Sequence, residues 1–276
     1  MSAITRYIPK NHVSYFTGKL VHLKLPRPLR FLTRFIIAKF AQAYRINLDE
    51  AEFKVQDYES LGDFFIRRLK PGVRPLGTTW AVHPADAVIT QAGNIREGNL
   101  IQAKGRQYSL KNFTQDEHGA EKWHDGVFLT YYLCPTDYHR VHSPVTGIIK
   151  RISHIPGKLW PVNSWSTTNI HELFSVNERI LVEIETDRGL VGVMFVGATN
   201  VGQIILAFDP EVIGNQMNAA IRYDKSYQVP VTKGDELGAF RMGSTVVMLY
   251  ASGQLPSTFV ATVWIERAVK VNSALV

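Results

Sequence analysis

The sequence predicts an α+β protein with a mainly β body of packed antiparallel sheets and a basic, amphipathic helical extension at its N-terminus. Apolar, β-branched runs of strand length recur from about residue 80 onward, separated by turn residues. The sequence lacks the alternation of strands and helices that a parallel sheet requires. Residues 1–75 instead show helical periodicity, and nine lysines and arginines precede the first acidic residue, Asp49.

The extension is predicted to contain two helices. Pro28 suits the first turn of a helix over residues 29–44, and Ser60 is a suitable N-cap for a second helix over residues 60–69. The first helix either lies in a lipid boundary with its arginines on anionic headgroups, or packs on the body with a solvated basic face. Its apolar residues on or near one face are Leu29, Leu32, Phe35, Ile36 and Phe40, flanked by Arg27, Arg30 and Arg34.

The body is predicted to be built from strands and hairpins. Residues 127–133 form a β-branched and aromatic run, and residues 180–185 and 190–196 flank the turn signal Asp187-Arg188-Gly189. Residues 259–266 are a further strand candidate. Pro71, Gly72 and Pro75 mark the boundary between a helical, membrane-associating region (1–75) and a catalytic domain (76–276).

Composition narrows the classes of function. The chain has 276 residues, 45% of them hydrophobic, and a net charge of +7, which favours an anionic partner. Nucleic acid is disfavoured because no recognition motif is present.

Cys134 is the only cysteine, so no intramolecular disulfide can form. We find no apolar run of the roughly 18 residues that a spanning helix needs and no signal-peptide core, so we expect a location in the cytoplasm or on a cytoplasmic face.

Three polar segments are candidates for chemistry. Asp86 precedes an apolar strand, where it either caps a turn or orients a histidine. His139 and His142 lie in a polar segment that is either a loop or a source of a general base. Gly243-Ser244 precedes the apolar run 246–250; it is either a simple turn or a peptide bond that the Ser244 hydroxyl attacks.

A metal site is the weaker alternative for these residues. Cys134, His139, His142 and Asp86 would be its ligands in a metal-dependent hydrolase, but the sequence contains no second pair of ligands at metal spacing. We therefore expect no metal. A third alternative is a lipid-binding module without catalytic activity.

Taken together and in order, these segments resemble the phosphatidylserine decarboxylase family. The resemblance extends from about residue 45 to 250. Met242 stands where the family's cleavage motif usually has leucine. The matching stretches are 84–86, 102–105 with 108–110, 137–142, 195–199 with 201–202, and 233–245.

The resemblance implies a proenzyme that cuts itself. Asp86, His142 and Ser244 would form the processing triad, in which Asp86 fixes the tautomer of His142 and His142 takes the Ser244 proton. Cleavage between Gly243 and Ser244 would give a β chain (1–243) and an α chain (244–276), which stay associated. Ser244 would become a covalent pyruvoyl group, the cofactor.

The mature enzyme implied by the resemblance acts on a phospholipid. The pyruvoyl group would form a Schiff base with phosphatidylserine and release carbon dioxide and phosphatidylethanolamine, with His139 binding the substrate and assisting protonation. The implied location is peripheral, on the cytoplasmic side of the cell membrane, where Arg27, Arg30, Arg34, Leu32, Phe35 and Ile36 meet an anionic surface. A homodimer is left open.

Overall fold

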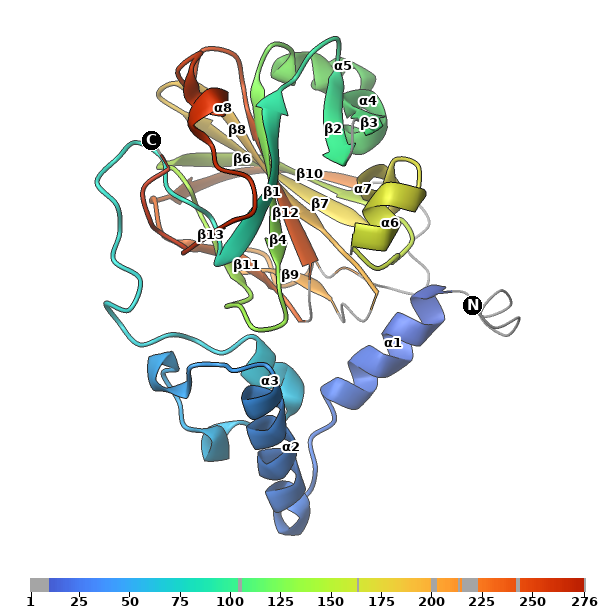
Figure 1. Cartoon of the computed structure of the whole chain (residues 1–276), viewed down its shortest axis with the longest axis vertical. Coiled ribbons are helices and arrows are strands. Elements are labelled where there is room, and N and C mark those ends of the chain that lie inside the picture. Colours follow the sequence, from blue (N-terminus) through green and yellow to red (C-terminus); the bar gives the residue numbers. More distant parts are fainter. Residues whose placement is uncertain are drawn as a thin grey trace.

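The computed structural model shows a β-sheet body with a helical N-terminal extension at one end (Figure 1). It describes residues 10–103, 106–162, 164–199, 203–212, 214, 223–241 and 244–275. Within these ranges the strands form an eight-stranded sheet, a three-stranded sheet and a two-stranded ribbon. All pairings between the named strands are antiparallel, so the predicted fold class is confirmed.

The named elements alternate irregularly along the chain. The strands are β1 Ala87–Asn94, β2 Asn99–Ala103, β3 Arg106–Ser109, β4 Val127–Leu133, β5 Arg140–His142, β6 Gly147–Ile155, β7 Arg179–Thr186, β8 Gly189–Val196, β9 Ile204–Leu206, β10 Tyr223–Val231, β11 Glu236–Phe240, β12 Ser244–Tyr250 and β13 Arg267–Val269. The α-helices are α1 Lys10–Val21, α2 Arg30–Ala43, α3 Leu61–Phe65, α4 Leu110–Thr114, α5 Glu117–Ala120, α6 Ser164–Asn169, α7 Leu173–Val176 and α8 Phe259–Thr262. Short 3₁₀ turns occupy Arg27–Leu29, Leu48–Glu50, Val55–Asp57 and Glu121–Trp123.

The large sheet has the strand order β10-β6-β7-β8-β12-β4-β1-β13. Its central strands β7, β8, β12 and β4 are buried along most of their length. A strand covered on both faces has a continuous apolar sequence, which explains the runs 127–133 and 246–250. The predicted hairpin is confirmed, since Thr186 of β7 pairs with Gly189 of β8 across the turn. Strand β12 lies between β8 and β4, in the middle of the core.

The small sheet has the order β5-β11-β9. Its middle strand approaches β9 so closely that a Cβ at Gly238 would lie 2.3 Å from the Ile205 carbonyl oxygen, so this position requires glycine. The chain leaves the small sheet at Phe240 and enters the large sheet at Ser244. The junction between the two sheets therefore falls between these two residues.

The extension has a hydrophobic cluster of its own. Helix α2 spans residues 30–43, within one residue of the predicted 29–44. The Ser60 hydroxyl accepts the Asp63 N–H at 3.0 Å and caps α3, as predicted. Helix α3 nevertheless ends at Phe65 and not at residue 69, because the backbone of residues 68–70 bonds to residues 50–52. The buried residues of the cluster are Ile37, Ala41, Ile46, Tyr58 and Phe64.

The predicted strand over residues 259–266 is wrong. The segment starts with one helical turn, α8, and β13 begins only at Arg267. The Pro256 carbonyl accepts the Phe259 N–H at 2.8 Å, which starts the turn. Phe259 is buried whereas Trp264 is 72% exposed. The apolar residues of this segment therefore face both the core and the solvent, and their presence does not indicate a strand.

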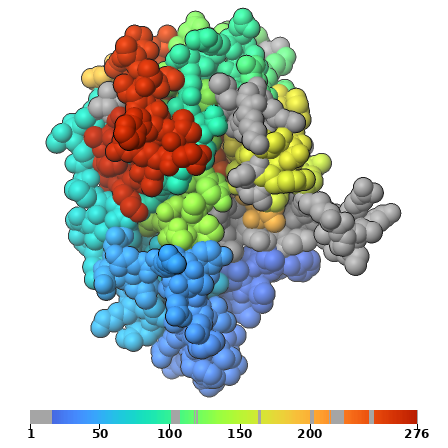
Figure 2. Space-filling model, in the orientation of Figure 1, coloured from blue at the N-terminus to red at the C-terminus, as the bar shows by residue number. Residues whose placement is uncertain are grey.

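The extension forms the lower end of the molecule, continuous with the body in the space-filling view (Figure 2). No helix in the described ranges is both long enough and apolar enough to cross a bilayer.

Candidate active site

Three neighbouring strands bring Asp86, Cys134 and Ser244 to the same end of the large sheet. Ser244, the first residue of β12, pairs with Leu133 at the end of β4. On the other side of β4, Val88 pairs with Tyr132, so continuing this antiparallel register places Asp86 opposite Cys134. Gly243 and Met242 lie outside the described residues, as does the side chain of Ser244.

The histidine segment reaches the same place from the small sheet. Residues 134–139 connect β4 to β5, and β5 pairs with β11, with His142 opposite Glu236. The Phe240 N–H donates to the His139 carbonyl at 3.0 Å. The chain thus passes His139 at the end of β11, four residues before Ser244. The fold therefore brings Asp86, His139 and Ser244 toward the junction of the two sheets. His142 lies opposite Glu236, at the other end of β11, where its N–H donates to the Pro84 carbonyl at 2.8 Å.

His139 presents an unpaired nitrogen in a buried position. Its Nδ1 donates to the Asp137 carbonyl oxygen at 2.9 Å, and because a carbonyl only accepts, Nδ1 carries the hydrogen. Its Nε2 is buried and has no hydrogen-bond partner among the described residues. Burial, reinforced by the charge of Arg67, lowers the pKa of His139 to about 3. The neutral ring therefore holds a free lone pair on Nε2, as a proton acceptor requires.

His142 has a partner on each ring nitrogen. Nδ1 lies 2.7 Å from the Gly234 carbonyl oxygen and so carries the hydrogen. Nε2 lies 3.0 Å from the Tyr138 hydroxyl, which donates to it when the ring is neutral. Burial lowers the pKa of His142, although the bond to Gly234 opposes this. The tautomer of His142 is thus fixed by a backbone carbonyl.

Asp86 is a buried carboxylate with several donors. Arg74 donates to it from Nε and from Nη2, at 3.0 and 2.7 Å, Lys270 Nζ lies at 3.2 Å, and the Val271 N–H lies at 2.9 Å. Burial alone would raise the pKa of Asp86, but the hydrogen bonds from Arg74 and Val271 and the charges of Arg74 and Lys270 hold it below its usual value. Asp86 is therefore ionised at neutral pH.

The structure does not join Asp86 to His142 by a side-chain hydrogen bond. Within the described part of the chain, the Asp86 oxygens bond to Arg74, Lys270 and Val271. The link to His142 runs through the backbone, since the His142 N–H donates to the Pro84 carbonyl at 2.8 Å. The negative charge of Asp86 still acts on His142, where it is a minor influence that raises the pKa.

Sequence reasoning missed three residues of this site. Tyr138 stood inside the histidine motif but received no role, although its hydroxyl contacts His142. Arg74 lies inside the boundary segment marked by Pro71, Gly72 and Pro75, and received no role from the sequence. Lys270 carried no sequence signal, since only the fold brings it to Asp86 across 184 positions.

The alternative metal site is not assembled. No group of three or more His, Cys, Asp or Glu side chains with suitable geometry occurs in the ranges that the structure describes. Both nitrogens of His142 have hydrogen-bond partners. Burial and the charge of Asp137 raise the pKa of the Cys134 thiol, which favours the protonated form and not the thiolate that binds metal.

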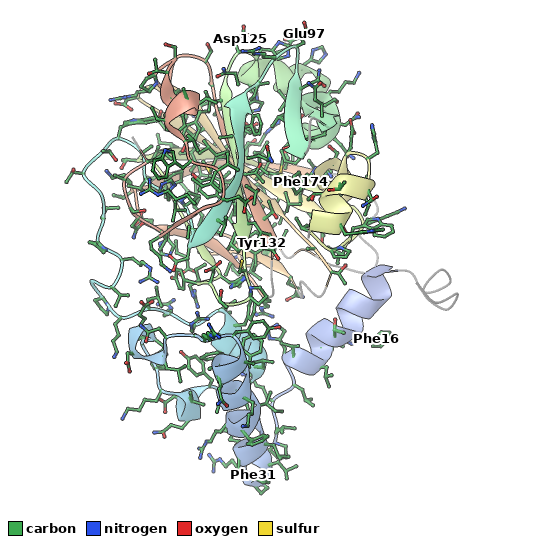
Figure 3. The ribbon with its side chains drawn as sticks, in the orientation of Figure 1. Phe16, Phe31, Glu97, Asp125, Tyr132 and Phe174 are labelled. Carbon is green, nitrogen blue, oxygen red and sulfur yellow. The ribbon has the colours of Figure 1, made fainter. Side chains whose placement is uncertain are left out.

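The extension carries an exposed apolar surface, defined here by Phe16, Leu20 and Leu23 in and after α1 and by Leu29, Phe31, Leu32, Phe35 and Ile36 in and before α2. Figure 3 shows Phe31 at the far tip of α2 and Phe16 on α1, both on the extension and away from the sheets. The predicted apolar face of α2 is therefore divided: Phe40 packs against the inner cluster, and the rest is exposed. Arg27 and Arg34 are also exposed, while Arg30 bonds to Glu59 at 3.1 Å.

The extension also touches the histidine segment directly. Arg67 Nη2 donates to the carbonyls of Thr136 and Asp137, at 3.1 and 3.3 Å, and Arg140 Nε donates to the Ile66 carbonyl at 2.9 Å. The Phe65 ring lies 4.1 Å from the His139 ring, centroid to centroid. The end of α3 is therefore a wall of the site.

Comparisons with known proteins agree on one family. A family model described as phosphatidylserine decarboxylase matches residues 61–276. The phosphatidylserine decarboxylase proenzymes of Anaeromyxobacter sp. (strain K) and Myxococcus xanthus are each 38% identical, over 253 and 250 residues, covering 90% of this chain and 88% of the relative. The proenzyme of Shewanella putrefaciens is 35% identical over 280 residues, covering 99% of this chain and 95% of the relative.

Proposed function

The chain belongs to the phosphatidylserine decarboxylase family, and from this premise we propose that it decarboxylates phosphatidylserine after cutting itself between Gly243 and Ser244. The observation that carries the proposal is the junction of the two sheets. There the segment that leads to Gly243 is bonded to His139, and Ser244 starts the central strand β12. The relatives are named proenzymes, which supports processing of the chain.

The cut is proposed to proceed on the chain's own atoms. The Ser244 oxygen attacks the Gly243 carbonyl carbon and gives up its proton to His142, and the amide nitrogen takes a proton and leaves. An ester now joins the two residues. Loss of the Ser244 α-proton expels the Gly243 carboxylate and leaves dehydroalanine, and water replaces the nitrogen, which departs as ammonia. A ketone, the pyruvoyl group, then ends the shorter chain.

His142 is suited to take the Ser244 proton at Nε2. Its Nδ1 hydrogen is held by the Gly234 carbonyl, so the lone pair is on Nε2, where the Tyr138 hydroxyl now donates. We propose that Asp86 supports this step by its charge and by fixing the turn that carries Pro84, whose carbonyl holds the His142 N–H. This role differs from the direct tautomer contact implied by the resemblance.

His139 fits a site that contains the pyruvoyl group. Its Nε2 is buried and unpaired among the described residues, next to the strand that leads to the cut. A buried polar atom without a partner is costly, and use by a reacting group is one physical reason for keeping it. When present, the pyruvoyl group supplies an electron sink for the pair released as carbon dioxide leaves. His139 would hold the substrate and control the proton that replaces the carboxylate.

The substrate is proposed to arrive from a membrane surface through the extension. The exposed apolar surface lies on α1 and α2, and the end of α3 contacts the histidine segment. Apolar side chains with exposed arginines bind anionic bilayers by partial insertion and charge attraction. We propose peripheral attachment at the cytoplasmic side of the cell membrane. The homodimer remains a prediction.

Denaturing mass spectrometry of the purified chain tests the proposal. The expected result is two fragments, residues 1–243 and 244–276, the smaller blocked by a ketone. Ser244→Ala should give one intact chain without decarboxylase activity, whereas Ser252→Ala, an exposed serine in the turn after β12, should be cut like the wild type. His139→Ala should be cut but inactive. An uncut wild-type chain, or activity in Ser244→Ala, would refute the proposal.

A further inference from the structure

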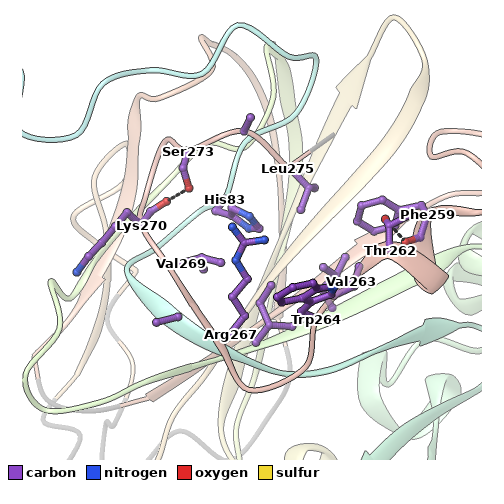
Figure 4. A pocket seen from close by; sticks show the side chains of 14 residues that line it. His83, Phe259, Thr262, Val263, Trp264, Arg267, Val269, Lys270, Ser273 and Leu275 are labelled. Atoms are coloured by element: carbon purple, nitrogen blue, oxygen red, sulfur yellow. Dashed lines mark hydrogen bonds between the residues drawn. The ribbon is translucent and has the colours of Figure 1, made fainter.

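A cavity outside the site described above lies beside β1, β4 and β13. Its volume is about 340 Å³, and the C-terminal segment after α8 forms most of its wall (Figure 4). Strands β1 and β4 contribute Ile89 and Leu129. Small-molecule pockets measure about 300–1,000 Å³, so this cavity accommodates a small ligand and not a whole membrane lipid.

Two nitrogen groups meet in the cavity without an anion. Figure 4 shows the Arg267 guanidinium beside the His83 ring. Among the described residues, the exposed Arg267 side chain makes no hydrogen bond or ion pair, and its one assigned contact is with the Trp264 ring, 6.0 Å from the centroid. The His83 ring shares one hydrogen bond among the described residues, between Nδ1 and the Tyr131 hydroxyl at 3.0 Å, which leaves Nε2 available. Burial and the charge of Arg267 lower the pKa of His83 to about 4.

The remaining lining supplies a second cation and apolar walls. Lys270 lines the cavity and is 59% exposed, and its one ion pair in the described structure is with Asp86 at 3.2 Å. Phe259, Trp264 and Leu275 provide apolar surface. A guanidinium, an imidazole and an ammonium group offer donors to three oxygens, which suits a phosphate monoester better than a carboxylate with its two oxygens.

We propose that this cavity binds a small phosphate monoester, with Arg267 and His83 on the phosphate, Lys270 at the rim and Trp264 against the apolar part of the ligand. The proposal is independent of the decarboxylase function. It has a structural consequence for Asp86, because Lys270 and Val271 belong to the cavity's wall segment and both donate to that carboxylate. A phosphate that draws Lys270 inward would remove one of the cations that hold the Asp86 charge.

Titration of the full-length protein with glycerol 3-phosphate tests the proposal, followed by the His83 ring resonances in NMR spectra. The His83→Gln variant assigns those resonances. Saturable shifts are expected, and Arg267→Gln should weaken binding about tenfold or more, since a charge-assisted hydrogen bond contributes about 1.5–3 kcal/mol. The matched control is Arg188→Gln, because Arg188 also lies over a tryptophan, Trp80, at 4.8 Å, but outside the cavity.

Two further probes separate the sources of the phosphate. Tighter binding of short-chain phosphatidic acid than of glycerol 3-phosphate would assign the site to a lipid headgroup, and equal binding of both would assign it to a soluble ester. The proposal is overturned if no phosphate compound shifts His83, if hexanoate binds as well as the phosphates, or if Arg267→Gln binds like the wild type.

Discussion

Arg74 donates from a single nitrogen to two carboxylates, and this gives a direct test of the site's electrostatics. Its Nη2 lies 2.7 Å from an oxygen of Asp86 and 2.7 Å from an oxygen of Glu50. The side chain of Asp86 is 2% exposed and that of Glu50 is 32% exposed. The Nη2 donor and its distance are the same for both acids, but Asp86 is more buried and also accepts from Arg74 Nε, Lys270 and the Val271 N–H. We predict that Asp86→Asn destabilises the fold far more than Glu50→Gln.

The expected magnitudes follow from the environments of the two acids. Asp86→Asn leaves the partly buried Arg74 without its main counter-charge and places an amide against the Val271 N–H or Lys270. Removing one partner of a buried ion pair costs about 3–5 kcal/mol. Glu50→Gln breaks a pair that water partly screens, which costs about 0.2–1 kcal/mol. The free energy of unfolding should therefore differ between the variants by about 2–5 kcal/mol.

Urea unfolding measures these differences, provided that the covalent state of the chain is the same in every sample. All variants should therefore carry Ser244→Ala, which keeps the proposed precursor uncut. The pH dependence gives a second readout. The pKa of Asp86 is lowered by folding, so its stabilisation is present above the unfolded pKa of about 3.9 and is lost as pH falls further. Equal destabilisation by Asp86→Asn and Glu50→Gln would refute the reasoning.

Three further predictions concern the core, the buried histidines and the extension. Asn177→Ala should destabilise the fold by about 2–4 kcal/mol, measured by urea unfolding. The buried Asn177 side chain accepts the Trp160 N–H and donates to the carbonyls of Trp160 and Gly197, each at 2.9 Å, and alanine would leave these backbone groups unpaired. His83 and His139 have pKa values lowered to about 4 and about 3, so the unfolded chain binds more protons below pH 6.5; stability should fall from pH 6.5 toward 4, and His83→Gln should reduce that slope. Ile36→Ser should weaken sedimentation with anionic vesicles by about tenfold, whereas Leu76→Ser, which removes an equally exposed residue (48% for both) outside α1 and α2, should not.

The fold was predictable where local pattern and burial agree. Strand β4 and the β7–β8 hairpin have strong strand composition and a clear turn, and the structure buries them as expected. Residues 259–266 have similar composition, but Pro256 starts a helical turn there and Trp264 faces solvent. Composition alone does not reveal which residues of an apolar segment will be buried, because burial depends on the distant parts of the chain that pack against the segment.

For the candidate site, the sequence singled out residues and motifs but not the contacts that those residues make. Asp86 comes to the same end of the large sheet as Ser244 because β1 and β12 both pair with β4, and His139 comes there because its carbonyl accepts the Phe240 N–H. Their hydrogen-bond partners are backbone carbonyls, as at Gly234, or residues remote in sequence, as Lys270 is from Asp86. Such partners leave no local signal, so the expected side-chain bond between Asp86 and His142 could not be checked without the fold.

A cut at Gly243–Ser244 would leave the chain held together at many points, which makes self-processing compatible with this fold. Strand β12 pairs with β4 on one side and β8 on the other along nearly its full length. The tail beyond it is held as well: β13 pairs with β1, the Val271 N–H binds Asp86, and the Leu275 N–H binds the Ala81 carbonyl. One broken peptide bond therefore frees an end at the sheet junction without releasing residues 244–276. The same Asp86 that supports the proposed cut would afterwards bind the shorter chain to the longer one.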